Sequence, residues 1–138
     1  MKKIKIMKKI LFILIALFSV GIFVAVANND KVINKSQLPA QAQEFIDSHF
    51  AGLDLVYAKK EYNIVFNSYE VRLADGSKLE FSSKGNWEEV DCQSGEVPSA
   101  IIPQPIKDYV EKNYAGAKIL LIEKNRKDYE VKLSNRLE

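Results

Sequence analysis

Apolar residues follow three patterns along this chain. Residues 10–27 form an apolar run without a charge, preceded by five lysines in the first nine positions. In 42–50 and 106–114, apolar residues recur every three or four positions, which predicts a helix with one buried face in each segment. Apolar and charged residues alternate in 69–73 and 78–81, which predicts strands with one buried and one solvated face.

The apolar run has the layout of a secretory signal peptide. A basic start and an apolar middle are followed by the small-x-small ending Ala25-Val26-Ala27. We therefore expect export to the periplasm or the cell exterior, with cleavage after Ala27. The alternative is an uncleaved anchor, because the run is just long enough to span a bilayer of about 30 Å. The polar segment 28–37 is interpreted as a flexible tether.

The rest of the chain matches itself. The helical pattern of 42–50 recurs in 106–114 at an offset of 64, and YEVRL at 69–73 recurs as YEVKL at 129–133 at an offset of 60. The change of offset places four extra residues in the first copy, most simply in a loop within Lys60–Ser68. Because residue class, spacing and punctuation all recur, the pattern indicates an internal duplication.

Turn and capping residues complete the predicted architecture. Pro39 lies near the start of the first predicted helix and Gly52 follows its last apolar residue, as is typical of helix ends. Asp75-Gly76 predicts a hairpin turn, because glycine adopts positive φ without steric cost. We therefore expect an α+β fold, a tandem repeat of a helix followed by an antiparallel β-meander.

The predicted boundaries follow from this repeat. Residues 38–92 form the first unit, with a helix and four strands, and 93–101 form a linker containing Gly, Pro and Ser. Residues 102–138 form the second unit, with a helix and about two strands. Nothing in it corresponds to Leu79–Asp91, so we interpret the second repeat as truncated. Its last strand would then offer an unpaired edge on which a second copy of the chain could pair.

Net charge separates the leader from the remainder. The whole chain has net charge +2, but without the leader's five lysines 15 basic residues stand against 18 acidic ones, a net charge of −3. Such a domain lacks the basic patch that nucleic acids require, so we expect no nucleic-acid partner. One Cys and one His exclude an internal disulfide and a zinc site made of Cys and His alone. We expect no cofactor and no metal.

Candidate catalytic residues all have simpler explanations. His49 corresponds to Asn113 in the second copy, which favours a hydrogen-bonding role at the helix end. Cys92 has no base near it in the sequence, so we expect a buried or unpaired thiol, or an intermolecular disulfide. The acids in 88–91 lack the spacing of a calcium loop and are interpreted as a solvated strand end. No phosphate loop, nucleophile elbow or zinc-protease motif occurs, so we do not expect an enzyme.

One sheet face remains as the predicted binding surface. If the apolar residues of the first meander face the helices, the charged residues between them face away. Trp87 and Val90 differ in parity, so without a bulge one of the two is exposed, and an exposed Trp among charges is typical of protein-binding surfaces. The alternative is a core Trp87 with Val90 outside. The candidate protein-binding sheet face consists of Glu70, Arg72, Lys78, Glu80 and Trp87.

Several motifs together suggest a family. They are Leu38-Pro-x-x-Ala42, Phe45-Ile46, His49-Phe50, Tyr69-Glu-Val-x-Leu73, Gly85-Asn86-Trp87, Val90-Asp91-Cys92 and Ile102-Pro103 with Tyr109-Val110 and Tyr114. Over nearly all of 38–138 the chain resembles the PepSY-like, beta-lactamase-inhibitor-like proteins of the bacterial envelope. The resemblance implies a curved antiparallel sheet with helices on its back and, by the family's name, protein binding or inhibition. It supplies no inhibitory residue.

The sequence thus predicts an exported, non-enzymatic binding module that docks an envelope protein or peptide through an open sheet face. Two other functions stay open: a carrier of a small ligand or lipid in a groove between the two repeats, and, as the least favoured, a hydrolase. Contact with a membrane is expected only through the leader, if it is uncleaved.

Overall fold

The computed structural model describes residues 30–135, so the predicted signal peptide lies outside the described residues. Seven strands form one antiparallel sheet: β1 (Lys31–Ile33), β2 (Leu55–Tyr62), β3 (Asn67–Leu73), β4 (Lys78–Ser82), β5 (Trp87–Asp91), β6 (Ile119–Lys124) and β7 (Tyr129–Leu133). Two α-helices, α2 (Ala40–His49) and α3 (Gln104–Asn113), each follow a short 3-10 helix, η1 (Lys35–Gln37) and η2 (Ser99–Ile101). The predicted α+β class is confirmed.

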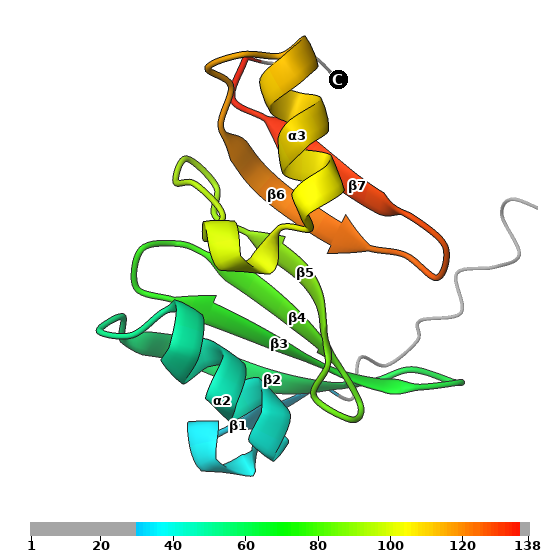
Figure 1. Ribbon diagram of the computed structural model, residues 1–138. Coiled ribbons are helices and arrows are strands. Elements are labelled where there is room, and N and C mark those ends of the chain that lie inside the picture. Colours follow the sequence, from blue (N-terminus) through cyan, green and yellow to red (C-terminus); the bar gives the residue numbers. More distant parts are fainter. Residues whose placement is uncertain (1–29, 136–138) are drawn as a thin grey trace, which may run out of the picture.

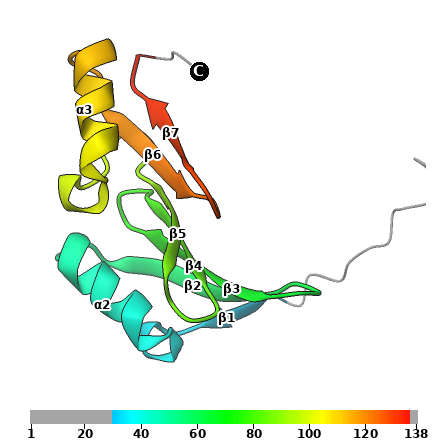
Figure 2. The same cartoon turned by 45° about the vertical axis from the view of Figure 1, so that its right-hand side comes forward.

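Both helices lie on the same side of the sheet, and the other side is uncovered (Figures 1 and 2). The strands are ordered in the sheet as they are in the chain, from β1 to β7. The helices form where the sequence predicts them, directly after Pro39 and Pro103 as N-caps. Gly52 and Gly116 follow the helices with φ of 83° and 80°, a region that favours glycine.

A row of apolar side chains crosses the whole sheet on the helix side. Each member lies directly opposite the next on the neighbouring strand: Ile33, Ala58, Val71, Leu79, Val90, Ile122 and Val131. All are buried except Val131, which is half-buried against the core. Ala42 and Ile46 of α2 and Val110 of α3 are buried in the same core. Slipping any strand by one residue would expose its member of this row, so the row specifies the register.

The same succession of elements occurs twice. The two α-helices and the strands that follow them, β2 and β6, begin at positions offset by 64, whereas β3 and β7 end at positions offset by 60. The offset changes within the hairpins, where 61–68 in the first correspond to 125–128 in the second. The extra residues lie within Lys60–Ser68, as the sequence predicts, but they lengthen the paired strands β2 and β3 and not the loop.

The predicted flexible tether at 28–37 is wrong for its described part. Lys31–Ile33 pairs with β2, and Ile33 is buried in the core. The backbone N–H of Asn34 donates to Gln37 Oε1 at 2.8 Å, as part of a capping box at η1. The segment looks like a tether in the sequence because this short strand buries only one residue.

The linker 93–101 is tied to β6 just before its first residue and again in its middle. The backbone N–H of Cys92 donates to the Leu120 carbonyl at 2.9 Å, and that of Val97 donates to the Ile119 carbonyl at 2.8 Å. Val97 is buried. The linker thus positions β6 beside β5 and joins the two units into one sheet. In residues 30–135, no helix has the length and apolarity needed to cross a membrane.

The turn between β4 and β5 supports the start of α2 and offers a test of the packing. A Cβ added to Gly85 would lie 2.8 Å from Pro39 Cβ and 3.0 Å from the Ala42 backbone nitrogen, whereas one added to Gly52 would meet nothing within 4 Å. Both glycines have positive φ. We expect Gly52→Ala to cost about 1–2 kcal/mol of unfolding free energy for backbone strain alone. Gly85→Ala should cost about 1–3 kcal/mol more, because α2 must shift. Urea unfolding of the two variants measures the difference, and equal losses would contradict the packing.

Candidate functional site

We call the uncovered side of the sheet the open face (Figure 2). Its side chains alternate with those of the buried row. One line of residues, the carboxylate row, crosses five adjacent strands of this face and consists of Glu70, Glu80, Glu89, Glu123 and Glu130. A parallel line of mixed character consists of Tyr57, Arg72, Lys78, Asp91, Leu121 and Lys132.

Four of the five predicted site residues lie together on the open face. Glu70 is directly opposite Glu80, and Arg72 is directly opposite Lys78, across the β3–β4 pair. The alternation of apolar and charged residues in these two strands was therefore sufficient to place them. Whether they contact a partner stays a prediction.

Trp87 lies on the other side of the sheet, which corrects the prediction that includes it in the open face. Glu80 is opposite Glu89, but the next residue, Phe81, is opposite Trp87, so Glu88 is the extra residue of a β-bulge. The bulge turns Trp87 to the same side as Val90. There its ring stacks on Phe45 of α2, with centroids 6.2 Å apart, and the Trp87–Tyr129 centroid distance is 6.4 Å.

In the first unit, the open face neutralises its own charges. Lys59 Nζ lies 2.7 Å from Glu61 Oε1 and 3.2 Å from Glu70 Oε2. The hydrogen bond with Glu61, helped by that with Glu70, raises the pKa of Lys59 above its usual value despite desolvation. Desolvation acts to raise the pKa of Glu70, but the hydrogen bonds from the Tyr57 hydroxyl and Lys59 outweigh it and lower this pKa.

Lys78 forms the second bridge. Its Nζ lies 2.9 Å from Glu80 Oε1 and 2.7 Å from Glu89 Oε1, so it links β4 to β5. Desolvation acts to lower the pKa of Lys78, but its hydrogen bonds to these two carboxylates raise it overall. Lys78 therefore stays charged at neutral pH.

In the second unit, the same positions repel. Glu123 stands where Lys59 stands in the first unit, at an offset of 64, and Glu130 stands where Glu70 stands, at an offset of 60. Glu123 lies directly opposite both Glu89 and Glu130. Among residues 30–135, no Lys, Arg or His nitrogen lies within 4.0 Å of the carboxylates of Glu123 and Glu130. Desolvation, and then the charges of Glu89 and Glu130, raise the pKa of Glu123.

The structure places two other candidate residues, His49 and Cys92, in packed surroundings. His49 packs on Phe45, with ring centroids 4.7 Å apart. Cys92 is buried, and desolvation raises the pKa of its thiol. Within residues 30–135, no three His, Cys, Asp or Glu side chains are grouped to hold a metal ion.

Sequence reasoning missed the acidic part of the face. Glu130 and Lys132 could have been predicted from the sequence, because YEVKL repeats YEVRL and these two residues therefore match Glu70 and Arg72. The apposition of Glu89 with Glu123 had no such signal, because it depends on how β6 pairs with β5 across the linker and α3.

Substitution of Glu123 and substitution of Glu70 by Gln should have opposite effects on the free energy of unfolding. Because the folded-state pKa of Glu123 is raised, its charge costs stability at neutral pH, and this cost disappears as pH falls and the carboxylate protonates. We expect Glu123→Gln to stabilise the fold at pH 7 by about 0.2–1 kcal/mol, with the gain lost in acid.

Glu70→Gln should destabilise the fold at pH 7 by about 1–3 kcal/mol, because the lowered pKa of Glu70 marks a favourable charge. Urea unfolding at several pH values checks both, and a destabilised Glu123→Gln would contradict the repulsion.

The comparisons with known proteins agree on the family. A family model described as "Putative beta-lactamase-inhibitor-like, PepSY-like" matches residues 67–138. A crystal structure of a "putative calcium-regulated periplasmic protein" from Bacteroides thetaiotaomicron is 53% identical, with a TM-score of 0.76, covering 78% of this chain and 85% of that one. No curated protein matches the chain.

Two structures from Bacteroides vulgatus are also similar. One, a "putative periplasmic protein" from the DUF2874 family, is 49% identical with a TM-score of 0.77, covering 79% of this chain and 86% of that one. The other, a "putative periplasmic protein of unknown function", is 46% identical with a TM-score of 0.75, covering 78% and 86%. The predicted resemblance is confirmed, and the chain belongs to the PepSY-like family, whose solved relatives are described as periplasmic.

Proposed function

We propose that this protein is an exported, non-enzymatic binding module of the bacterial envelope that docks a basic segment of a protein or peptide on its open face. The signal-peptide pattern of 1–27, with cleavage after Ala27, and the periplasmic description of the relatives support export. The observation that carries the binding role is the part of the carboxylate row on β5, β6 and β7, where Glu123 lies opposite both Glu89 and Glu130 and, among residues 30–135, only Glu89 has a cationic partner, Lys78.

Repulsion between these glutamates favours a cationic partner over an apolar one. Like charges directly opposite each other on neighbouring strands destabilise a sheet. In the first unit the fold avoids this cost with Lys59 and Lys78. In the second unit the fold does not avoid this repulsion, although a Lys at position 123 would reproduce the pairing of Lys59 with Glu70. A lysine or arginine from a partner would relieve the repulsion, and so binding and stability are linked at Glu123.

Spacing within the row sets the form of the partner. Neighbouring strands lie about 4.8 Å apart, so the carboxylates of Glu89, Glu123 and Glu130 follow one another at about that interval across the sheet. Alternate side chains of an extended peptide lie about 6.6 Å apart. A peptide that crosses the strands obliquely can therefore place successive basic residues near successive carboxylates. Binding of this kind weakens with added salt.

Calcium is a less suitable occupant of this row. One relative is described as calcium-regulated, and Ca²⁺ takes six to eight oxygen ligands. In residues 30–135, however, no three acidic, His or Cys side chains are grouped for a metal ion. We therefore propose a basic peptide as the partner and include calcium as an arm of the test.

The carrier alternative gains little from the geometry. A hollow between α3, η2 and β6, lined in part by Val97, Val110 and Ile119, has a volume of about 200 Å³. A second hollow, beside α2 and the β4–β5 turn and lined in part by His49 and Trp87, has a volume of about 280 Å³. Pockets for small ligands usually measure about 300–1,000 Å³. Neither hollow lies between the two units: the first is lined by the linker and the second unit, and the second by the first unit alone.

We also propose that the two units are copies of one ancestral unit. Equivalent backbone hydrogen bonds support this: Ala74 N–H donates to the Asp54 carbonyl at 2.8 Å, and Ser134 N–H donates to the Lys118 carbonyl at 2.9 Å. A register shift occurs at the matching place in both hairpins, at Val56 and at Leu120. Duplication explains why a lysine and a glutamate can be compared at positions 59 and 123.

Charge removal on the open face provides the test. A fluorescent peptide of alternating lysine and threonine should bind the wild-type protein, and Glu123→Gln/Glu130→Gln should weaken binding at least tenfold, because the double variant removes the unpaired carboxylates. The control is Glu96→Gln/Glu111→Gln, which changes the net charge equally at exposed positions of the linker and α3. Fluorescence anisotropy measures both affinities.

Equal weakening by the two double variants would mean that net charge alone attracts the peptide, and the proposed site would be wrong. Competition by millimolar Ca²⁺ beyond that of Mg²⁺ at the same concentration would indicate a calcium site in place of a peptide site.

A further inference from the structure

The tip of the β2–β3 hairpin exposes consecutive large apolar residues. Ile64 is 97% exposed, Val65 71% and Phe66 63%, and the neighbouring Tyr62 is also exposed. Figure 1 shows this hairpin projecting beyond the other strands of the sheet. Ile64, Val65 and Phe66 lie outside the hydrophobic core, so their side chains contribute little to the stability of the fold.

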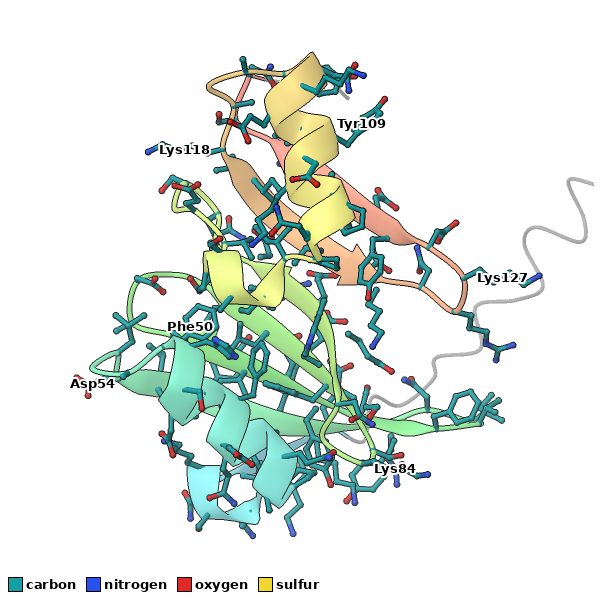
Figure 3. The ribbon with its side chains drawn as sticks, viewed as in Figure 1. Phe50, Asp54, Lys84, Tyr109, Lys118 and Lys127 are labelled. Carbon is teal, nitrogen blue, oxygen red and sulfur yellow. The ribbon has the colours of Figure 1, made fainter. Side chains whose placement is uncertain are left out.

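The second hairpin shows that the turn itself does not require them. Asn63 N–H donates to the Phe66 carbonyl at 3.2 Å, and at the equivalent place Asn125 N–H donates to the Asp128 carbonyl at 2.9 Å. The central residues are Ile64-Val65 in the first turn and Arg126-Lys127 in the second. Figure 3 shows Lys127 pointing into solvent at the tip of its hairpin. Since polar residues are the usual occupants of turns, Ile64 and Val65 call for an explanation outside the fold.

We propose that the tip of the β2–β3 hairpin, Tyr62–Phe66, inserts into the lipid–water interface of an envelope membrane. The tip is a convex projection, and lipid chains can surround such a shape without a complementary pocket. It combines two aliphatic residues with the aromatic residues Tyr62 and Phe66, and aromatic side chains are enriched where membranes meet water. The hydrogen bond across the turn satisfies two backbone groups that would otherwise be costly to bring near lipid.

Basic residues lie just behind the apolar tip. Lys60 Nζ is 5.0 Å from the centroid of the Tyr62 ring and 5.8 Å from that of Tyr69. Lys31 of β1 is directly opposite Lys60. Lysine side chains in this position can keep their charge in the headgroup layer while their methylenes lie along apolar surface. The order of apolar tip, aromatic ring and amine matches the order of environments that a hairpin meets on entering a membrane.

The path of the chain brings the apolar run 10–27 toward the end of the sheet that carries the tip. β1 begins opposite Lys60, and Asp30 lies 3.5 Å from Lys59, so the chain enters the sheet at the end that carries the tip. Only residues 28 and 29 separate Asp30 from the apolar run 10–27. Two residues and their flanking bonds span about 10 Å at most. In a folded chain whose leader is still in the membrane, the tip would therefore lie close to that membrane. The sequence alone predicts membrane contact only for the leader, and this inference adds the folded part.

Vesicle binding tests the proposal with the chain 28–138, which contains every element described, so that the leader cannot supply the membrane affinity. Vesicles of phosphatidylcholine, which is zwitterionic and has no net charge, remove the effect of a net surface charge. We expect the wild-type chain to sediment with the vesicles and Ile64→Ser/Val65→Ser to bind about tenfold more weakly, because two apolar side chains are lost. Thermal unfolding of both proteins should coincide, since the tip is exposed.

Val56→Ser is the matched control, because Val56 is an exposed apolar residue at the opposite end of β2. It should change vesicle binding less than twofold. An equal loss in Val56→Ser, or no sedimentation of the wild-type chain, would overturn the proposal. If the serine variant instead loses an identified envelope protein while vesicles stay unbound, the tip is a protein-docking element and the lipid assignment is wrong. Binding of the basic peptide to the open face should be unaffected by Ile64→Ser/Val65→Ser, so the two proposals can fail separately.

Discussion

The arrangement of this protein depends on the apolar row that crosses all seven strands from Ile33 to Val131. The period of a strand is two, so burying this row against α2 and α3 fixes which residues face the other way. The carboxylate row is the direct consequence, one position along each strand from the buried one. Changing the register to separate the glutamates would expose the core, and so the fold keeps their repulsion.

Bulges modify this alternation at three places, and they decide what each face contains. Those at Val56 and Leu120 occur at equivalent positions in the two hairpins. The third, at Glu88, has no counterpart in the described part of the second unit, and it moves Trp87 from the open face to the aromatic contacts with Phe45 and Tyr129. The open face consequently contains mostly charged side chains beside Tyr57 and Leu121, which suits a charged partner better than the aromatic anchor that sequence parity suggested.

Local patterns predicted what local physics determines. The two helices followed from their apolar period, with Pro39 and Gly52 at the ends of the first, and four strands of the first unit followed from alternation and turn residues. β1 was missed because a strand that buries only Ile33 leaves almost no pattern. The open-face positions of Glu70 and Arg72 could be predicted because apolar and charged residues alternate along their strand. The contact of Glu89 with Glu123 could not, because the pairing of β5 with β6 depends on how the linker and α3 fold between them. The bulge at Glu88 left one signal in the sequence, the difference in parity between Trp87 and Val90, and that signal fits an exposed residue as well as it fits a bulge.

The differences between the two units separate stability from function. At equivalent positions the first unit has Lys59 3.2 Å from Glu70, and the second has Glu123 opposite Glu130. The hairpin tips differ in the reverse sense: the first carries Ile64-Val65 and the second Arg126-Lys127. The first unit therefore neutralises its glutamate but has an apolar hairpin tip, whereas the second has a polar hairpin tip but, within residues 30–135, leaves Glu123 and Glu130 without a lysine between them. Because the two units share one backbone arrangement, this fold can accommodate both a lysine between the glutamates and a polar hairpin tip. The carboxylate row and the apolar tip lack these features, and a second molecule bound at either place would lower the free energy of the protein.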